Sequence, residues 1–166
     1  GRERNYIGEE RALLASPKIA TYDLQPEMSA YEVTDRLIQA IESSRFDAII
    51  CNYANCDMVG HTGDYSAAMK SVNVVDECLE KVLASMLKIG GDTLITADHG
   101  NVETMYDATT QQPHTQHTTL PVPLVYVGDK TITLSQGGSL ADIAPTILSL
   151  MNLPKPAEMT GRSLID

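Results

Sequence analysis

Apolar residues recur along this chain at intervals of three or four, the spacing that gives a helix one buried face. Three stretches follow this pattern and predict helices, over about 30–43, through 69–86 and over 139–150. Ser29 precedes the first stretch and Glu32 follows three residues later, which is the spacing of a helix capping box. The pattern therefore predicts a chain with much of its length in helices.

Three short apolar runs, at 46–52, 93–97 and 122–127, predict buried strands. The predicted strands are interspersed with the predicted helices along the chain, and this arrangement favours an α/β fold with a mostly parallel sheet flanked by helices. Pro145 lies inside the last predicted helix and predicts a kink or a late start there. The remaining long segments are expected to be irregular or polar loops: 1–29, 53–64 and 100–119.

The composition limits the classes of partner. The chain has 166 residues, of which 12 are basic and 22 acidic, so its formal net charge is −10. This length suits one domain, and a hydrophobic share of 43% is enough for a core. The acidic balance disfavours nucleic acids and anionic membranes, and no window reaches the roughly 20 apolar residues of a transmembrane helix. We therefore expect no nucleic-acid or membrane partner.

The cysteines and the first residue add two smaller expectations. Cys51, Cys56 and Cys78 match no common zinc or disulfide spacing, and we expect them to be small buried side chains. The chain begins at Gly1 rather than at Met and has no signal-peptide pattern. Either a start has been removed, or the chain is a piece of a longer protein.

Candidate chemistry is concentrated in the predicted loops. Asp57 and His61 follow the first predicted strand, and Asp98 and His99 follow the second. In open α/β sheets the carboxyl ends of strands form one edge, where binding sites lie. Carboxylate and imidazole ligands together suit divalent ions such as Mn²⁺ or Zn²⁺. The pattern predicts a metal site at this edge.

The grouping of ligands remains open at this stage. Asp57, His61 and one later histidine, His114 or His117, could hold one ion. Asp98 and His99 point to opposite sides of an extended backbone, so they would flank this ion or bridge toward a second one. Two adjacent metals are typical of phosphoryl or sulfuryl transfer. The alternative is that these residues are ordinary polar loop and cap residues.

Three segments resemble the metal-site motifs of cofactor-independent (2,3-bisphosphoglycerate-independent) phosphoglycerate mutases, members of the alkaline phosphatase superfamily. They are Asp-Met-Val-Gly-His-Thr-Gly at 57–63, Thr-Ala-Asp-His-Gly-Asn at 96–101 and the run that begins at His114 and ends at Pro123. Residues 16–30 and 159–165 are similar to the same family. The resemblance covers essentially the whole chain and implies an alkaline-phosphatase-like α/β fold.

The resemblance also implies an activity. Family members interconvert 3-phosphoglycerate and 2-phosphoglycerate in glycolysis through a phosphoserine intermediate at a site with two Mn²⁺ ions. By similarity, Asp57, His61 and His117 would bind one manganese, and His117 is preferred to His114 because it fills the family's His-Thr-Thr-x-Pro-Val-Pro run. Asp98 and His99 would belong to the second set. A glycolytic enzyme is expected in the cytoplasm.

The same resemblance implies that the domain is incomplete, since residues 1–166 correspond only to the C-terminal portion of the phosphatase-like domain. The family's nucleophilic Ser, one Asp ligand and an inserted phosphotransferase domain have no counterpart here. We expect this chain alone to lack mutase activity, to hold one metal ion or none, and to self-associate through exposed strand edges.

Two other interpretations stay open. The first is another metal-dependent phosphomutase, phosphatase or sulfatase of the same superfamily, although the runs at 21–28 and 52–55 favour the glycerate mutases. The second is a non-catalytic module in which the metal is structural. An upstream reading frame that encodes an Asp-bearing strand and a Ser-bearing loop would favour the enzyme.

Overall fold

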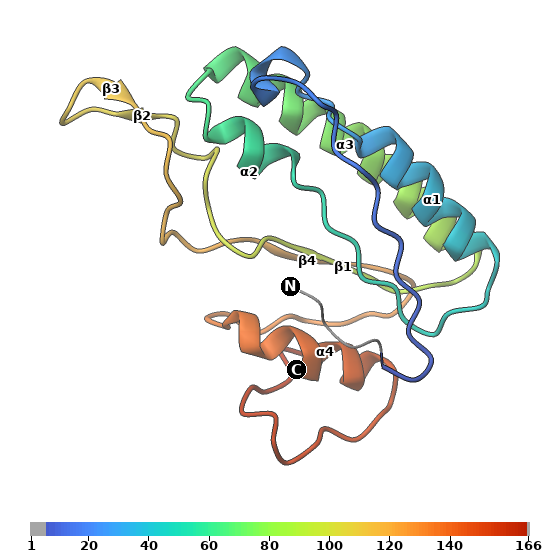
Figure 1. Cartoon of the computed structure of the whole chain (residues 1–166). Helices are drawn as coiled ribbons and strands as arrows, with labels where there is room; N and C mark the ends of the chain where they lie inside the picture. The colour runs from blue at the N-terminus through green and yellow to red at the C-terminus, as the bar shows by residue number, and fades with distance from the viewer. Residues whose placement is uncertain (1–5, 166) are drawn as a thin grey trace. The chain divides into compact units, whose positions relative to one another are not determined.

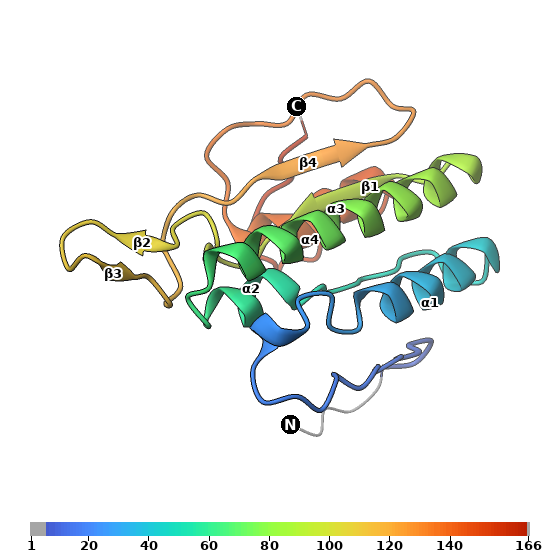
Figure 2. The same ribbon diagram turned by 90° about the horizontal axis from the view of Figure 1, so that it is seen from above.

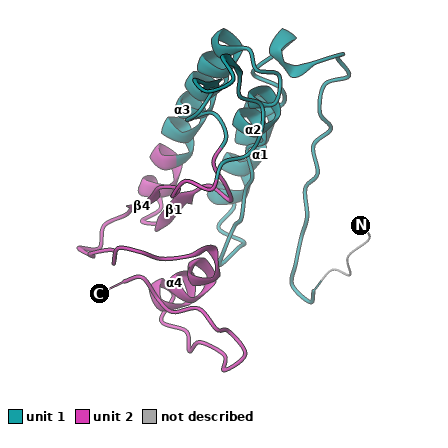
Figure 3. Cartoon of the chain, turned by 90° about the vertical axis from the view of Figure 1, so that its left-hand side faces the viewer, with its two compact units in different colours: residues 1–82, 101–118 teal, residues 83–100, 119–166 magenta. Residues whose placement is uncertain are grey.

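The structure is a computed structural model that describes residues 6–165. The chain divides into two compact units, coloured separately in Figure 3. Unit 1 comprises residues 1–82 and 101–118, and unit 2 comprises residues 83–100 and 119–166. Residues 1–5 of the predicted irregular start lie outside the described part of the chain.

Helices dominate unit 1, and the first two predicted helices are confirmed. Figures 1 and 2 both show α1 lying alongside α3. The Tyr31 hydroxyl of α1 donates to the Glu77 carboxylate of α3 at 3.1 Å, and the Lys81 ammonium lies 5.3 Å from the centre of the Tyr31 ring. The elements are η1 (Tyr22–Leu24), α1 (Ala30–Glu42), α2 (Asn55–Gly60) and α3 (Tyr65–Lys88), of which the last turn and a half belongs to unit 2.

The structure differs from the prediction between residues 46 and 60. The predicted strand at 46–52 is wrong: the segment forms no strand, and no backbone hydrogen bond joins residues 46–53 to another described residue. A strand requires a hydrogen-bonded neighbour, which this apolar run lacks within the described residues. The predicted loop 53–64 instead contains α2, whose buried Asn55 amide donates to the carbonyls of Pro26 and Glu27 at 2.9 and 2.8 Å.

A small hairpin completes unit 1. Within the predicted polar loop 100–119, β2 (Tyr106–Asp107) pairs antiparallel with β3 (Gln112–Pro113). In Figures 1 and 2 the hairpin projects away from the helices of unit 1. It returns the chain to the segment that carries His114 and His117.

Unit 2 contains the other sheet, and the pairing direction corrects the expectation of a mostly parallel sheet. Strand β1 (Thr93–Thr96) pairs antiparallel with β4 (Leu124–Val127), with Thr93 opposite Val127. Parallel neighbours need a crossover, usually a helix, whereas the chain between these strands contains no helix. The α/β class stands, with two small antiparallel sheets among the described residues.

The last helix begins late, as Pro145 predicts. A short 3-10 helix, η2 (Leu140–Asp142), leads into α4 (Ile143–Leu150), so Pro145 lies in the first turn, where its missing N–H is tolerated. Ser139 and Asp142 form a capping box. No helix in the described part of the chain is both long enough and apolar enough to cross a membrane.

The cysteine expectation is confirmed only in part. Cys78 is fully buried, Cys56 is partly buried, and Cys51 is exposed. Cys51 lies in the unpaired segment 46–53, so its exposure has the same cause as the missing strand.

Candidate metal centre

Asp57 and His61 are brought together by α2. They stand four residues apart, one helical turn, and the His61 N–H donates to the Asp57 carbonyl at 3.1 Å. Nε2 of His61 lies 3.2 Å from Oδ1 of Asp57. This pair follows from sequence spacing once the helix forms.

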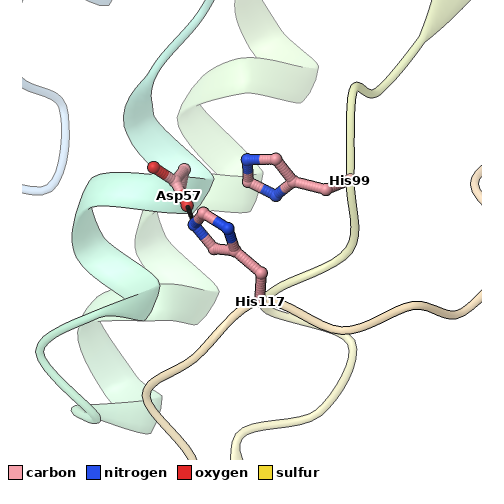
Figure 4. A group of neighbouring side chains, drawn as sticks. All are labelled: Asp57, His99 and His117. Carbon is pink, nitrogen blue, oxygen red and sulfur yellow. Dashed lines mark ion pairs between the residues drawn. The ribbon is translucent and has the colours of Figure 1, made fainter. Parts of the chain in front are cut away.

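His117 joins the pair from the segment after the β2–β3 hairpin. Its Nε2 lies 2.9 Å from Asp57 Oδ1, the ion pair dashed in Figure 4, and 3.0 Å from His61 Nε2. Two ligand atoms that are each about 2.1 Å from a shared ion are about 3.0 Å apart at a right angle and about 3.4 Å apart at the tetrahedral angle. The three atoms therefore already have the spacing of ligands around one ion.

The His61 ring is oriented for metal binding by a backbone carbonyl. Its Nδ1 lies 2.7 Å from the Thr115 oxygen. A carbonyl can only accept, so Nδ1 carries a proton, and in the neutral form of the ring the lone pair is then on Nε2, the nitrogen nearest Asp57. Two acceptor atoms that face each other repel unless a proton or a cation lies between them. The His61 side chain is 40% exposed and that of Asp57 33%, so an ion from solvent can reach the cluster.

Asn101 and Glu103 support this cluster, and sequence reasoning did not single them out. Buried Asn101 donates from Nδ2 to Asp57 Oδ1 at 2.9 Å. Its backbone N–H donates to Glu103 at 2.6 Å, and the Thr118 hydroxyl donates to the other Glu103 oxygen. Desolvation raises the pKa of Glu103, but hydrogen bonds from the Thr118 hydroxyl and from the backbone N–H groups of Glu103 and Asn101, together with His114, hold the pKa below the usual Glu value. Asn101 lies two residues after His99 in one of the three motifs, and this position was the feature of the sequence that could have marked it as part of the site.

The other predicted site residues belong to other segments of the chain. Asp98 and His99 follow β1 in unit 2, where Asp98 Oδ2 is 3.7 Å from His99 Nε2. Figure 4 also shows His99, a residue of unit 2. In unit 1, the His114 N–H donates to the Met105 carbonyl, and its buried Nδ1 has no hydrogen-bond partner among the described residues. The geometry of unit 1 therefore groups His117, and not His114, with Asp57 and His61.

Comparisons with known proteins agree with the resemblance noted in the sequence. The chain is 65% identical over 165 residues to the 2,3-bisphosphoglycerate-independent phosphoglycerate mutase of Cellvibrio japonicus and 63% identical to that of Saccharophagus degradans. Each alignment covers 99% of this chain but only 32% of the relative, so the chain spans about a third of the length of these relatives.

A solved structure supports the fold. The crystal structure of Leishmania mexicana phosphoglycerate mutase at low cobalt concentration superposes with a TM-score of 0.82 and 29% identity, over 91% of this chain and 30% of that chain. The profile of the metalloenzyme superfamily matches residues 1–155. With that match over most of its length, the chain belongs to the metalloenzyme superfamily.

Proposed function

We propose that this chain is the part of a cofactor-independent phosphoglycerate mutase that supplies most of its metal ligands. The whole enzyme would interconvert 3-phosphoglycerate and 2-phosphoglycerate, an intramolecular phosphoryl transfer. High identity to mutases along 165 residues supports this assignment over other phosphomutases, phosphatases and sulfatases. A cytoplasmic location is proposed on the same ground.

Asp57, His61 and His117 would hold one Mn²⁺ ion, and Asp98 and His99 would belong to the ligand set of a second. A bound divalent ion supplies Lewis acidity for phosphoryl transfer. The observation that carries the proposal is the convergence of one carboxylate oxygen and two imidazole nitrogens, with separations of 2.9–3.2 Å, in a chain of this superfamily. This mixed set suits Mn²⁺ and Zn²⁺ better than Mg²⁺, which prefers oxygen ligands.

The chain alone would be inactive. We place the nucleophilic Ser, one further Asp ligand and the phosphotransferase domain in the part of the relatives that this chain does not cover. The 166 residues alone would bind a metal without turning over substrate, and the unpaired segment 46–53 would lead them to self-associate.

Metal binding is tested by titrating Mn²⁺ and Zn²⁺ into the purified chain by calorimetry. We expect binding that falls at least about 10-fold in Asp57→Asn and His117→Ala, because each loses one ligand. His114→Ala is the matched control, since it removes a histidine three positions away and should bind as the unchanged chain does. Equal affinity in all four proteins would refute the ligand assignment.

The activity is tested in a chimera. This chain replaces the matching third of the Cellvibrio japonicus mutase, and conversion of 3-phosphoglycerate is assayed with Mn²⁺. An active chimera that His117→Ala inactivates and His114→Ala does not is the expected result. Two outcomes would contradict the proposal: an inactive but folded chimera, or turnover by the isolated chain at the rate of the intact mutase.

A further inference from the structure

The Asn101 side chain is hydrogen-bonded to Asp57. It is 5% exposed, and its Nδ2 donates to Asp57 Oδ1 at 2.9 Å and lies 3.3 Å from the Asp57 carbonyl oxygen. Its own Oδ1 is buried and has no hydrogen-bond partner among the described residues. Leaving a buried acceptor unpaired costs free energy, so this arrangement favours the contact with Asp57 over the pairing of the amide oxygen.

The bond goes to the carboxylate oxygen that faces the two histidines. Asp57 Oδ1 is the atom 2.9 Å from His117 Nε2 and 3.2 Å from His61 Nε2. A carboxylate oxygen has two lone-pair directions. Because Asn101 occupies one of them, the other is directed toward the imidazoles, where an ion would be held.

The backbone of Asn101 connects to the third ligand. Its N–H donates to Glu103, and the second Glu103 oxygen accepts the hydroxyl of Thr118, the residue directly after His117. Hydrogen bonds to a charged carboxylate are stronger than those between neutral groups. Asn101 and Glu103 therefore tie α2, which carries Asp57, to the segment that carries His117.

We propose that Asn101 is a positioning residue of the metal centre, which fixes the Asp57 carboxylate and, through Glu103, the His117 segment. This inference deepens the proposed function and rests on it. Asn101 does not itself bind the ion. It keeps the donor atoms at ligand spacing before an ion arrives, which lowers the reorganisation that binding requires.

The test uses the full 166-residue chain and measures its affinity for Mn²⁺. Asn101→Ala should weaken binding about 10- to 100-fold, the effect typical of lost outer-shell support. Asn101→Asp keeps the shape but replaces the donor by a second carboxylate, and it should also weaken binding. Added negative charge by itself would strengthen the binding of a cation, so a loss in Asn101→Asp identifies the missing hydrogen bond. Asn73→Ala and Asn73→Asp, at an exposed position of α3, are matched controls.

A second readout needs no metal. In the metal-free chain, the ring nitrogen signals of His61 and His117 should shift in both Asn101 variants and stay in place in the Asn73 variants. Thermal unfolding of the same samples separates positioning from a purely structural role, which would lower the midpoint and leave affinity and ring signals unchanged.

Three outcomes are distinct. Weakened binding with shifted ring signals supports the inference. Unchanged affinity in folded Asn101 variants overturns it and leaves the proposed function standing. Failure of the unchanged chain to bind Mn²⁺ refutes the proposed metal site, and this inference with it.

Discussion

Gly60 leaves the space that the Asn101 amide occupies beside Asp57. A Cβ added at Gly60 would meet the Asn101 side-chain oxygen and carbon well inside van der Waals distance and would touch Val102 at 3.0 Å. Gly60 is the last residue of α2, so a methyl group there cannot move without moving the helix. The absence of one side chain thus permits the contact between α2 and Asn101.

We predict that Gly60→Ala destabilises the chain by about 1–3 kcal/mol, the usual cost of overpacking a filled site. Ala is intrinsically better than Gly in a helix, so a loss in denaturant unfolding would identify the steric clash. The control is the same Gly60→Ala change made in a chain that already carries Asn101→Ala. Without the amide, Gly60→Ala should lose most of its effect on the free energy of unfolding. An additive double variant would contradict this explanation.

At the scale of elements, one carboxylate in unit 2 joins a helix start to the end of the chain. Asp142 accepts the Ser139 N–H at 2.7 Å and the Arg162 N–H at 2.8 Å. The buried Thr146 hydroxyl donates to the Asp142 carbonyl and accepts the Leu164 N–H. The segment around Arg162 and Leu164 is therefore held to η2 and α4 by polar contacts as well as by burial of Leu164.

This network predicts an acid-sensitive stability. The backbone N–H groups of Arg162 and Ser139 lower the pKa of Asp142 below its ordinary value of 3.8. A lowered folded-state pKa contributes stability that is present above the ordinary value and is lost as the pH falls through the folded value. Asp142→Asn should lower the melting temperature at pH 7, and the difference from the unchanged chain should shrink as the pH falls below 3.8.

Exposed Asp129 provides the control for this measurement, since Asp129→Asn should leave the melting temperature at pH 7 unchanged. If the melting temperature of Asp142→Asn differs from that of the unchanged chain by the same amount at pH 7 and at pH values well below 3.8, the role given to the Asp142 charge is contradicted.

The two capping motifs show why elements are predicted better than their ends. Ser29 and Glu32 have capping-box spacing, yet Ser29 makes no cap bond and its hydroxyl donates to the Ala15 carbonyl at 2.8 Å. Ser139, before the last helix, does form a capping box. A short hydroxyl side chain bonds to whichever backbone group is nearest. Which group that is depends on how segments far away in the sequence fold back onto the helix end.

At the scale of the whole molecule, the segment 46–53 is an apolar part of unit 1 that no strand pairs with among the described residues. Ile50 is 90% exposed and Ile49 39% exposed, and the backbone around them has no hydrogen bonds to the described residues. An extended apolar segment with free N–H and C=O groups is a template for pairing with another chain. Two copies paired antiparallel around Ile49 and Ile50 would also place Phe46 opposite Tyr53, an aromatic pair.

We predict that the purified chain forms dimers or larger assemblies as its concentration rises, measured by light scattering. Ile50→Asp should shift the chain toward monomer, because a charge in the paired segment opposes association. Leu24→Asp, at a 68% exposed apolar residue outside this segment, is the control and should not change the assembly. A compact monomer at high concentration in the unchanged chain would overturn the prediction.

The features that depend on neighbours close in the sequence could be predicted from the sequence. Helical periodicity predicted α1 and α3, and Pro145 predicted the late start of α4. The four-residue spacing of Asp57 and His61 predicted that these two side chains belong to one site. The motifs also indicated the superfamily, because three short runs with metal-ligand residue types occur along the chain in the order that the family has. These features need only covalent connection and helix geometry.

Tertiary structure decided what joins residues far apart in the chain. It grouped His117 with Asp57, enclosed Asn101 against Gly60, made β1 and β4 antiparallel and left the backbone of 46–53 without a hydrogen-bonded neighbour among the described residues. Such contacts depend on the path of the intervening residues, and local pattern does not encode that path. A buried strand and an unpaired apolar segment have the same sequence pattern, and only a hydrogen-bonded neighbour distinguishes them.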